Sequence, residues 1–209
     1  LIVGGGHIAY RKASLLVKAG AIVDVIAPEI EPELRQLVYK SMGQYIQAAF
    51  SENILATGYR LVIAATDNTA VNKSVFEQCE ARNILVNSVD DIPNCRFMVP
   101  AIIDRSPLVI SVASNGASPV LSRQLRTQIE TIVPHGMGKL AEFSGLWRKQ
   151  VKEKISNPDE RRIFWENLYA SPLKEQVFND NLDVANDLIQ QALTEWIAPK
   201  GEVYLVGAG

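Results

Sequence analysis

The sequence predicts an α/β protein, with a doubly wound parallel sheet followed by an antiparallel extension and a small helical domain. Three observations support this fold class. Apolar strands alternate with helical stretches over the first 90 residues, the opening strand runs into three glycines, and every strong signal after Ser118 is helical. With 209 residues, of which 47% are hydrophobic, the chain can fill a sizeable core.

The first 90 residues alternate between short apolar strands and helical patterns. The expected elements are a strand at 2–3, a helix at 7–19, a strand at 22–27, a helix at 28–42, a polar strand at 45–48, a strand at 61–65, a helix at 70–82 and a strand at 84–89. Near-continuous apolar strands separated by helices indicate a parallel sheet that is covered on both faces.

The pattern changes after Asp90. Two strand-like segments, 98–103 and 108–114, flank a turn signal and predict an antiparallel extension that could pair with a second subunit. A helix is expected to begin at Ser118-Pro119, where a capping serine precedes a proline. Three more helices are expected around 140–155, from Asn157 and over 181–196.

A glycine loop follows the first strand directly. Gly4-Gly5-Gly6-His7-Ile8-Ala9 matches G-x-G-x-x-A between a strand and a helix, which is the setting of a Rossmann-like dinucleotide site. A side chain there would hold a pyrophosphate away from the backbone N–H groups. The alternative is a tight strand-to-helix turn that holds no ligand.

Two acidic residues could bind the ribose of a dinucleotide. Asp24 has the expected spacing but is placed inside a buried strand, whereas Glu29 lies just past the strand end, so Glu29 is favoured. No Arg or Lys lies at that strand end to balance a 2′-phosphate, so NAD is expected rather than NADP.

Two further carboxylates follow strands at the edge where ligands bind to doubly wound sheets. Thr66-Asp67 follows one strand and is assigned to the cofactor side, although Asp67 could instead cap the next helix. Asp90 follows the next strand with no helix to cap, and could act as a general base while hydride leaves the substrate. The alternative for Asp90 is a solvated loop carboxylate.

Histidines and cysteines predict no metal site. His7 is expected to lie exposed beside the cofactor without a chemical role, and His135 lies in a loop far along the chain. Cys79 and Cys95 are not closely spaced and are expected to be reduced. With the two histidines far apart and no paired cysteines, no preformed metal cage is visible.

Charge is distributed unevenly along the chain. The formal net charge is only −2, yet residues 119–163 hold 9 Lys/Arg against 5 Asp/Glu. This basic segment is either a set of solvated helix faces or a binding surface for a small polyanion. Neither nucleic acid nor a membrane is an expected partner, because the total charge is near zero and no apolar run approaches about 18 residues. A cytoplasmic location is the default expectation.

Several stretches, found in one order, resemble the siroheme synthase family. They are Val3–Lys12, Ala64–Asp67, Asn87–Asp90, Phe97–Arg105, Ser118–Arg123 and Glu160–Glu166. The resemblance covers essentially the whole chain, and it is far more specific than the glycine loop alone.

The resemblance implies the part of these enzymes that carries precorrin-2 dehydrogenase and sirohydrochlorin ferrochelatase activity, as a homodimer formed through an antiparallel dimerisation extension. In the family, precorrin-2 is oxidised by NAD to sirohydrochlorin, into which Fe²⁺ is then inserted as a substrate. The resemblance further implies that Asp90 serves both steps and that His7, Ile8, Pro28 and Glu29 line the NAD site.

A tetrapyrrole of this class carries eight carboxylates, which gives the basic segment a ligand. Arg123 and Arg126 could clamp the rim of this substrate, and Asn87, Ser114 and Asn115 are assigned to the substrate side as well. If the Ser114 loop borders the pocket, a phosphate on Ser114 would repel the substrate carboxylates.

The chain ends as it begins, with an apolar run that breaks into glycines. Residues 201–209 resemble the opening of the methyltransferase domain of trifunctional siroheme synthases, a domain that uses S-adenosylmethionine. We therefore expect a chain truncated at its C-terminus. Truncation at the N-terminus is expected too, because the chain does not begin with Met and its first strand would be only about three residues long. The expected organisation is an NAD-binding Rossmann-like domain at 1–99, a dimerisation segment at 100–135, a helical domain at 136–198, and a linker with the first methyltransferase strand at 199–209.

Two other interpretations remain open. The chain could be an NAD-sensing module that signals through its helical half without turnover, or it could be a dehydrogenase without chelatase activity. Asp90 and the basic segment favour an enzyme, because a sensor needs neither of them.

Overall fold

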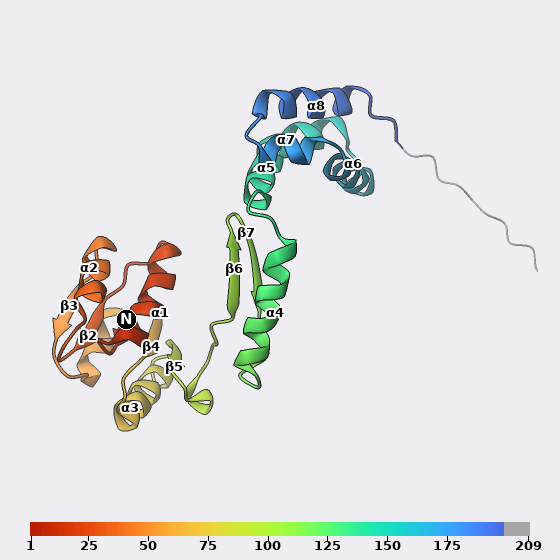
Figure 1. Ribbon diagram of the computed structural model, residues 1–209. Helices are drawn as coiled ribbons and strands as arrows, with labels where there is room; N and C mark the ends of the chain where they lie inside the picture. The colour runs from red at the N-terminus through yellow and green to blue at the C-terminus, as the bar shows by residue number, and fades with distance from the viewer. Residues whose placement is uncertain (199–209) are drawn as a thin grey trace, which may run out of the picture. The chain divides into compact units, whose positions relative to one another are not determined.

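The computed structural model describes residues 1–198 (Figure 1). It divides the chain into two compact units. The first contains residues 1–99 and 115–117, and the second contains residues 100–114 and 118–198. The expected linker and methyltransferase strand at 199–209 lie outside the described residues.

The first unit is built on a five-stranded parallel sheet, which confirms the predicted fold class. Its strands are β1 (Ile2–Val3), β2 (Val25–Ala27), β3 (Tyr45–Gln47), β4 (Leu61–Ala64) and β5 (Leu85–Ser88), in the spatial order β3-β2-β1-β4-β5. The chain leaves β1 toward β2 on one side and later returns to β4 on the other. This reversal of strand order marks the point where doubly wound sheets bind ligands.

Helices cover both faces of the sheet (Figure 1). On one face α1 (His7–Lys18) and α2 (Pro32–Lys40) pack in an apolar cluster with Ile2, Val25 and Ile63. On the other face α3 (Thr69–Glu80) packs with Val3, Val62 and Val86, next to the 3₁₀ helix η1 (Glu52–Thr57), which periodicity did not predict. Both faces of the short strands are therefore buried, as their apolar sequences require.

Two predicted boundaries in the first unit are wrong. The helix expected from Pro28 begins at Pro32, because Glu31 is extended before the proline and its N–H donates to the Gly5 carbonyl at 2.8 Å. The strand expected from Ile22 begins at Val25, since Ile22 is 65% exposed and outside the ladder. In both cases the element is shorter than predicted, and the loop before it is longer.

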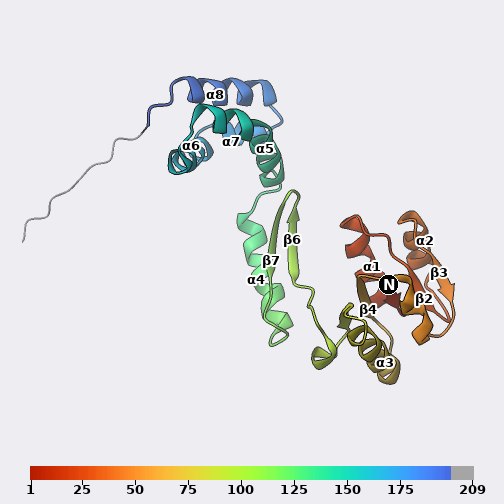
Figure 2. The same ribbon diagram turned by 180° about the vertical axis from the view of Figure 1, so that it is seen from behind.

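The second unit begins with an antiparallel hairpin of β6 (Ala101–Arg105) and β7 (Leu108–Val112). Helix α4 (Pro119–Ile132) lies along this hairpin in both views (Figure 1 and Figure 2). The side chain of Ser118 caps α4 and accepts the N–H of Leu121 at 3.3 Å, as the sequence predicts. The buried guanidinium of Arg105 pairs with Glu130 at 3.4 Å, so the hairpin and helix are joined by charge as well as by packing.

Four further helices form a separate apolar cluster in the second unit: α5 (Met137–Lys154), α6 (Pro158–Ala170), α7 (Leu173–Phe178) and α8 (Leu182–Thr194). Asn157 caps α6 as expected and accepts the N–H of Asp159 at 2.9 Å. Helix α7 was not predicted, because six residues are too few to show a helical period. Leu173 and Val177 within it are nevertheless fully buried.

Candidate dinucleotide site and catalytic edge

Two glycines of the loop are required by close backbone contacts. Gly4 has φ +122°, and a Cβ on it would lie 2.3 Å from the Ala65 carbonyl oxygen at the end of β4. A Cβ on Gly5 would lie 1.9 Å from the carbonyl oxygen of Glu29, just past the end of β2. The turn after β1 therefore fits between the ends of its two neighbouring strands only without side chains.

Gly6 has a different environment. Its backbone is ordinary at φ −91°, and a Cβ built on it would meet no described atom within 4 Å. Gly6 is the N-cap of α1, no described side chain caps this helix, and its first turn holds no acidic residue. Ala9, the small third position of the motif, is fully buried against the sheet. The open space thus lies over an uncapped helix N-terminus, which suits an anionic group such as a pyrophosphate.

Glu29 is better placed than Asp24 to bind a ribose. The two carboxylate oxygens of Asp24 accept the backbone N–H of Gln44 and the hydroxyl of Tyr59, each at 2.8 Å, just before β2 begins. Glu29 and Pro28 are exposed at the opposite end of that strand, where the glycine loop contacts the Glu29 backbone. His7 and Ile8 are exposed in the first turn of α1.

The segment after β4 depends on a residue that sequence reasoning missed. Buried Asn72 of α3 donates to the Thr66 carbonyl at 2.9 Å and accepts the Thr66 hydroxyl at 2.7 Å. Asn68 caps α3, so Asp67 is not needed as a cap and is exposed. The sequence signal was an asparagine on the same helix face as Val75 and Cys79. A buried amide there needs hydrogen-bond partners, which the chain after β4 supplies.

Asp90 lies at the end of β5, on an exposed turn. It has φ +58°, a left-handed conformation that Asp adopts more readily than most residues. Among residues 1–198 its carboxylate makes no hydrogen bond or ion pair shorter than 4 Å. The structure therefore leaves this carboxylate available to a ligand.

Hydrogen bonds to backbone carbonyls hold the turn that carries Asp90. The Cys95 thiol donates to the carbonyls of Ser88 at 3.1 Å and Asp91 at 3.3 Å, while the Asn87 amide donates to the Phe97 carbonyl at 3.0 Å. Asn87 is 5% exposed, and its Oδ1 has no hydrogen-bond partner within the described part of the chain. A buried acceptor without a partner lowers the free energy of unfolding by about 1–3 kcal/mol. Stability alone therefore does not explain why an asparagine occupies this position.

The residues assigned to the tetrapyrrole lie mostly in the second unit. Arg126 donates to the Ile102 carbonyl at 3.2 Å and pairs with Glu130 at 2.9 Å, which ties it to the hairpin. Arg123 is exposed on α4, and the Ser114 hydroxyl accepts the N–H of Ser118 at 3.1 Å. Asn115 has φ +48° and belongs to the first unit. Their roles in substrate binding stay predictions.

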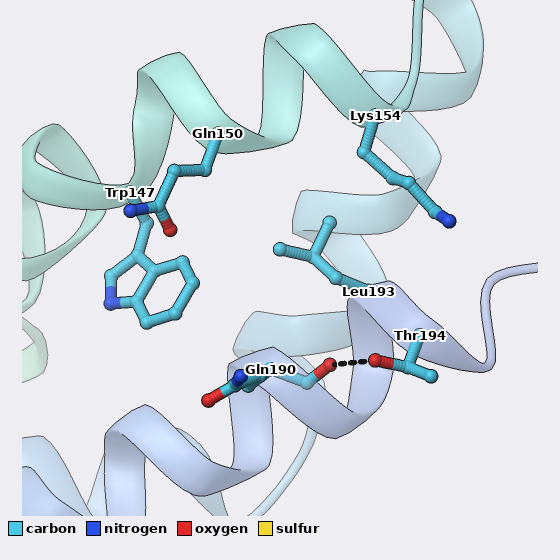
Figure 3. A pocket seen from close by; sticks show the side chains of 6 residues that line it. All are labelled: Trp147, Gln150, Lys154, Gln190, Leu193 and Thr194. Atoms are coloured by element: carbon cyan, nitrogen blue, oxygen red, sulfur yellow. Dashed lines mark hydrogen bonds between the residues drawn. The ribbon is translucent and has the colours of Figure 1, made fainter.

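A pocket of about 500 Å³ lies between α5 and α8 (Figure 3). It is lined by Trp147, Gln150, Lys154, Gln190, Leu193 and Thr194. None of the predicted site residues lines this pocket.

Residues 1–198 contain no group of three or more His, Cys, Asp or Glu placed to hold a metal ion. No described helix is long and apolar enough to cross a membrane.

Both halves of the chain match known protein families. A family model described as "Putative NAD(P)-binding" matches residues 1–101, and one described as "Sirohaem synthase dimerisation region" matches residues 136–193. Siroheme synthase from Acinetobacter baylyi is 77% identical over the whole chain, and that from Methylobacillus flagellatus is 46% identical. The resemblance to the siroheme synthases is confirmed along the whole chain. The chain spans 46% and 45% of the lengths of these two relatives.

A solved structure titled "SirC, precorrin-2 dehydrogenase" has the same fold. Its TM-score is 0.69 at 22% sequence identity, and the match covers 92% of each chain. The dimerisation model matches α5 to α8, which sequence reasoning assigns to the helical domain. The dimerisation role assigned to residues 100–135 stays a prediction.

The different environments of Gly4 and Gly6 predict different costs of substitution. Gly4→Ala should destabilise the first unit by about 1–3 kcal/mol, because a side chain there is strained and meets the Ala65 carbonyl. Gly6→Ala should cost less, about 0.5–1 kcal/mol, because only the preference of an N-cap for Gly over Ala is lost. Urea unfolding followed by far-UV circular dichroism measures both, and equal losses would contradict the geometry described.

Proposed function

We propose that this chain forms the NAD-dependent precorrin-2 dehydrogenase part of a siroheme synthase. The observation that carries the proposal is the open space over Gly6 at the N-terminus of α1. Asp90 follows β5 of the same sheet, and its carboxylate has no hydrogen bond or ion pair among residues 1–198. The match of residues 1–101 to an NAD(P)-binding model supports the cofactor class. The siroheme synthase relatives support the pathway.

Different residues of the first unit would bind different parts of a dinucleotide. Gly4, Gly5 and Gly6 bring the backbone close to the pyrophosphate, and His7 and Ile8 line it from the first turn of α1. Pro28 and Glu29 hold the adenosine ribose, where Glu29 favours the free 2′-hydroxyl of NAD over a 2′-phosphate. Thr66, fixed by Asn72, and Asp67 border the cofactor from the end of β4. NAD, when bound, supplies the hydride acceptor.

Asp90 is proposed as the general base. Oxidation of precorrin-2 removes a hydride and a proton, and the carboxylate at the end of β5 accepts the proton as the hydride leaves. No side-chain contact within residues 1–198 has to be broken for this transfer. The hydrogen bond from the Asn87 amide to the Phe97 carbonyl stabilises the turn that carries Asp90.

The second unit supplies charge for the substrate in this proposal. Arg123 is exposed and can pair with a propionate or acetate of the tetrapyrrole, whereas Arg126 already has partners in the hairpin and contributes less. Ser114 and Asn115 are assigned to the pocket border. Insertion of Fe²⁺ into sirohydrochlorin is proposed as a second reaction, in which Asp90 accepts pyrrole protons while the macrocycle supplies the nitrogen ligands.

The dehydrogenase is tested by supplying precorrin-2 and NAD, following NADH, and then adding Fe²⁺. Asp90→Asn keeps the shape of the side chain but removes its basicity, so NADH formation should fall by about 10²–10⁴-fold. NAD affinity should be retained. Asp183→Asn, at an exposed position of α8, is the matched control and should match the parent.

Each outcome of this experiment has a separate meaning. Unchanged NADH formation in Asp90→Asn would refute the base assignment. If the intact protein binds NAD but forms no NADH, the dehydrogenase proposal fails and the NAD-sensing interpretation is favoured. NADH formation without subsequent siroheme would restrict the chain to the first reaction.

A homodimer is proposed from exposed apolar residues on α4. Leu121, Leu125 and Ile132 follow one stripe of the helix and are 49%, 39% and 75% exposed. Exposed apolar stripes of this kind are typical of surfaces that a second subunit covers. The match of residues 136–193 to a dimerisation region supports the same oligomeric state.

Sedimentation velocity tests the dimer. The parent should sediment at about twice the 23.0 kDa mass of one chain. The double substitution Leu121→Glu and Leu125→Glu should give a monomer, because two buried carboxylates would face the partner. Met42→Glu, at a position 80% exposed in the first unit, should remain dimeric. A dimeric double variant would rule out this face of α4.

A further inference from the structure

Helix α1 has a second role at the edge of the sheet where Asp90 lies. Val89 and Phe97 pack in the same apolar cluster as Ala9 and Ala13 of α1. These two residues flank the turn that contains Asp90 and Cys95, so the helix lies against this turn as well as against the glycine loop. Lys12 is half-buried on α1, between the turns of Ala9 and Ala13.

The ammonium of Lys12 interacts with the groups of that turn. Asp90 and Cys95 act on it electrostatically from the connection between β5 and β6, and Arg11 acts on it from the same helix. Burial lowers the pKa of Lys12 below its ordinary value of 10.5, and repulsion by Arg11 lowers it further, whereas Asp90 and Cys95 act in the opposite direction. Within residues 1–198, Lys12 makes no hydrogen bond or ion pair of its own.

Asn87 of β5 lies beside Cys95. The Asn87 amide donates to Cys95 Sγ at 3.4 Å and to the Phe97 carbonyl at 3.0 Å. Because a carbonyl can only accept, the bond to Phe97 fixes which way the amide faces, and Asn87 Oδ1 is left as an unpaired acceptor. The residue that carries this unpaired acceptor thus bonds to Cys95.

We propose that Lys12 is a positioning residue for Asp90, whose ammonium holds the Asp90 carboxylate in place at the end of β5. This inference rests on the proposed function, because it assigns Lys12 a part in the proton transfer. Lys12 acts through Asp90 and does not itself take the proton. The positive charge is the property that matters, so arginine can replace lysine and an uncharged side chain of similar length cannot.

The first test measures the electrostatic effect of Lys12 on Cys95 without using enzyme activity. The thiolate is the nucleophile in alkylation, and a nearby cation favours it. Lys12→Met should therefore slow alkylation of Cys95 by iodoacetamide at pH 8 by about two- to fivefold, and Lys12→Arg should restore the rate. Cys79 does not interfere, because it is fully buried and burial raises its pKa to about 11. Lys40→Met, at an exposed position of α2, is the matched control.

The second test measures NADH formation from precorrin-2 in the same variants of the full chain. Lys12→Met should lower kcat by about tenfold with an unchanged KM for NAD, and Lys12→Arg should recover at least half of the parent value. Because the pKa of Lys12 is lowered, parent activity should decline at alkaline pH below 10.5 as the ammonium loses its proton. Lys12→Arg should retain activity there, since a guanidinium stays charged.

The outcomes separate this inference from the function on which it rests. An active parent with unchanged kcat and unchanged Cys95 alkylation in Lys12→Met overturns the role of Lys12 and spares the dehydrogenase. Equal losses in Lys12→Met and Lys12→Arg overturn it too, because shape rather than charge would then matter. A parent that forms no NADH overturns the dehydrogenase and, with it, the positioning role.

Discussion

The tight backbone packing of the glycine loop is the constraint on which the first unit depends. The turn after β1 passes between the backbone of Ala65 after β4 and that of Glu29 after β2, at separations that admit no Cβ on Gly4 or Gly5. This packing fixes the start of α1 and brings the carboxyl ends of three strands to one place. The same close contacts require Gly4 and Gly5 whether or not a ligand binds. Gly6 alone of the three has open space where a side chain would lie, so it is the position at which a ligand can be tested.

Helix α1 lies against both the glycine loop and the turn of Asp90. Its N-terminus borders the open space over Gly6, and one or two turns later it carries Ala9, Lys12 and Ala13 to the turn of Asp90. That turn is held by Cys95 and Asn87 through bonds to backbone carbonyls. In the proposed function, the cofactor and the proton acceptor are thus both held against one helix, as catalysis with a bound cofactor requires.

Much of this arrangement could be predicted from the sequence, because local signals were strong. The glycine motif, the buried strands and the caps at Ser118 and Asn157 each depend on residues close together in the chain. The start of α2, the role of Asn72 and the hairpin contacts of Arg126 were missed. Each depends on a partner that only the fold supplies: the Gly5 carbonyl, Thr66, or Ile102 together with Glu130. Lys12 belongs with these, since nothing in its spacing relates it to Asp90.

Calorimetric titration with NAD tests most directly whether the space over Gly6 holds the pyrophosphate of NAD. Gly6→Val should fold normally and weaken NAD binding at least tenfold, because the side chain would occupy that space. Gly145→Val is the matched control, since Gly145 on α5 also has open space around it. It should bind NAD like the parent. Equal affinity in the parent and Gly6→Val would contradict the account.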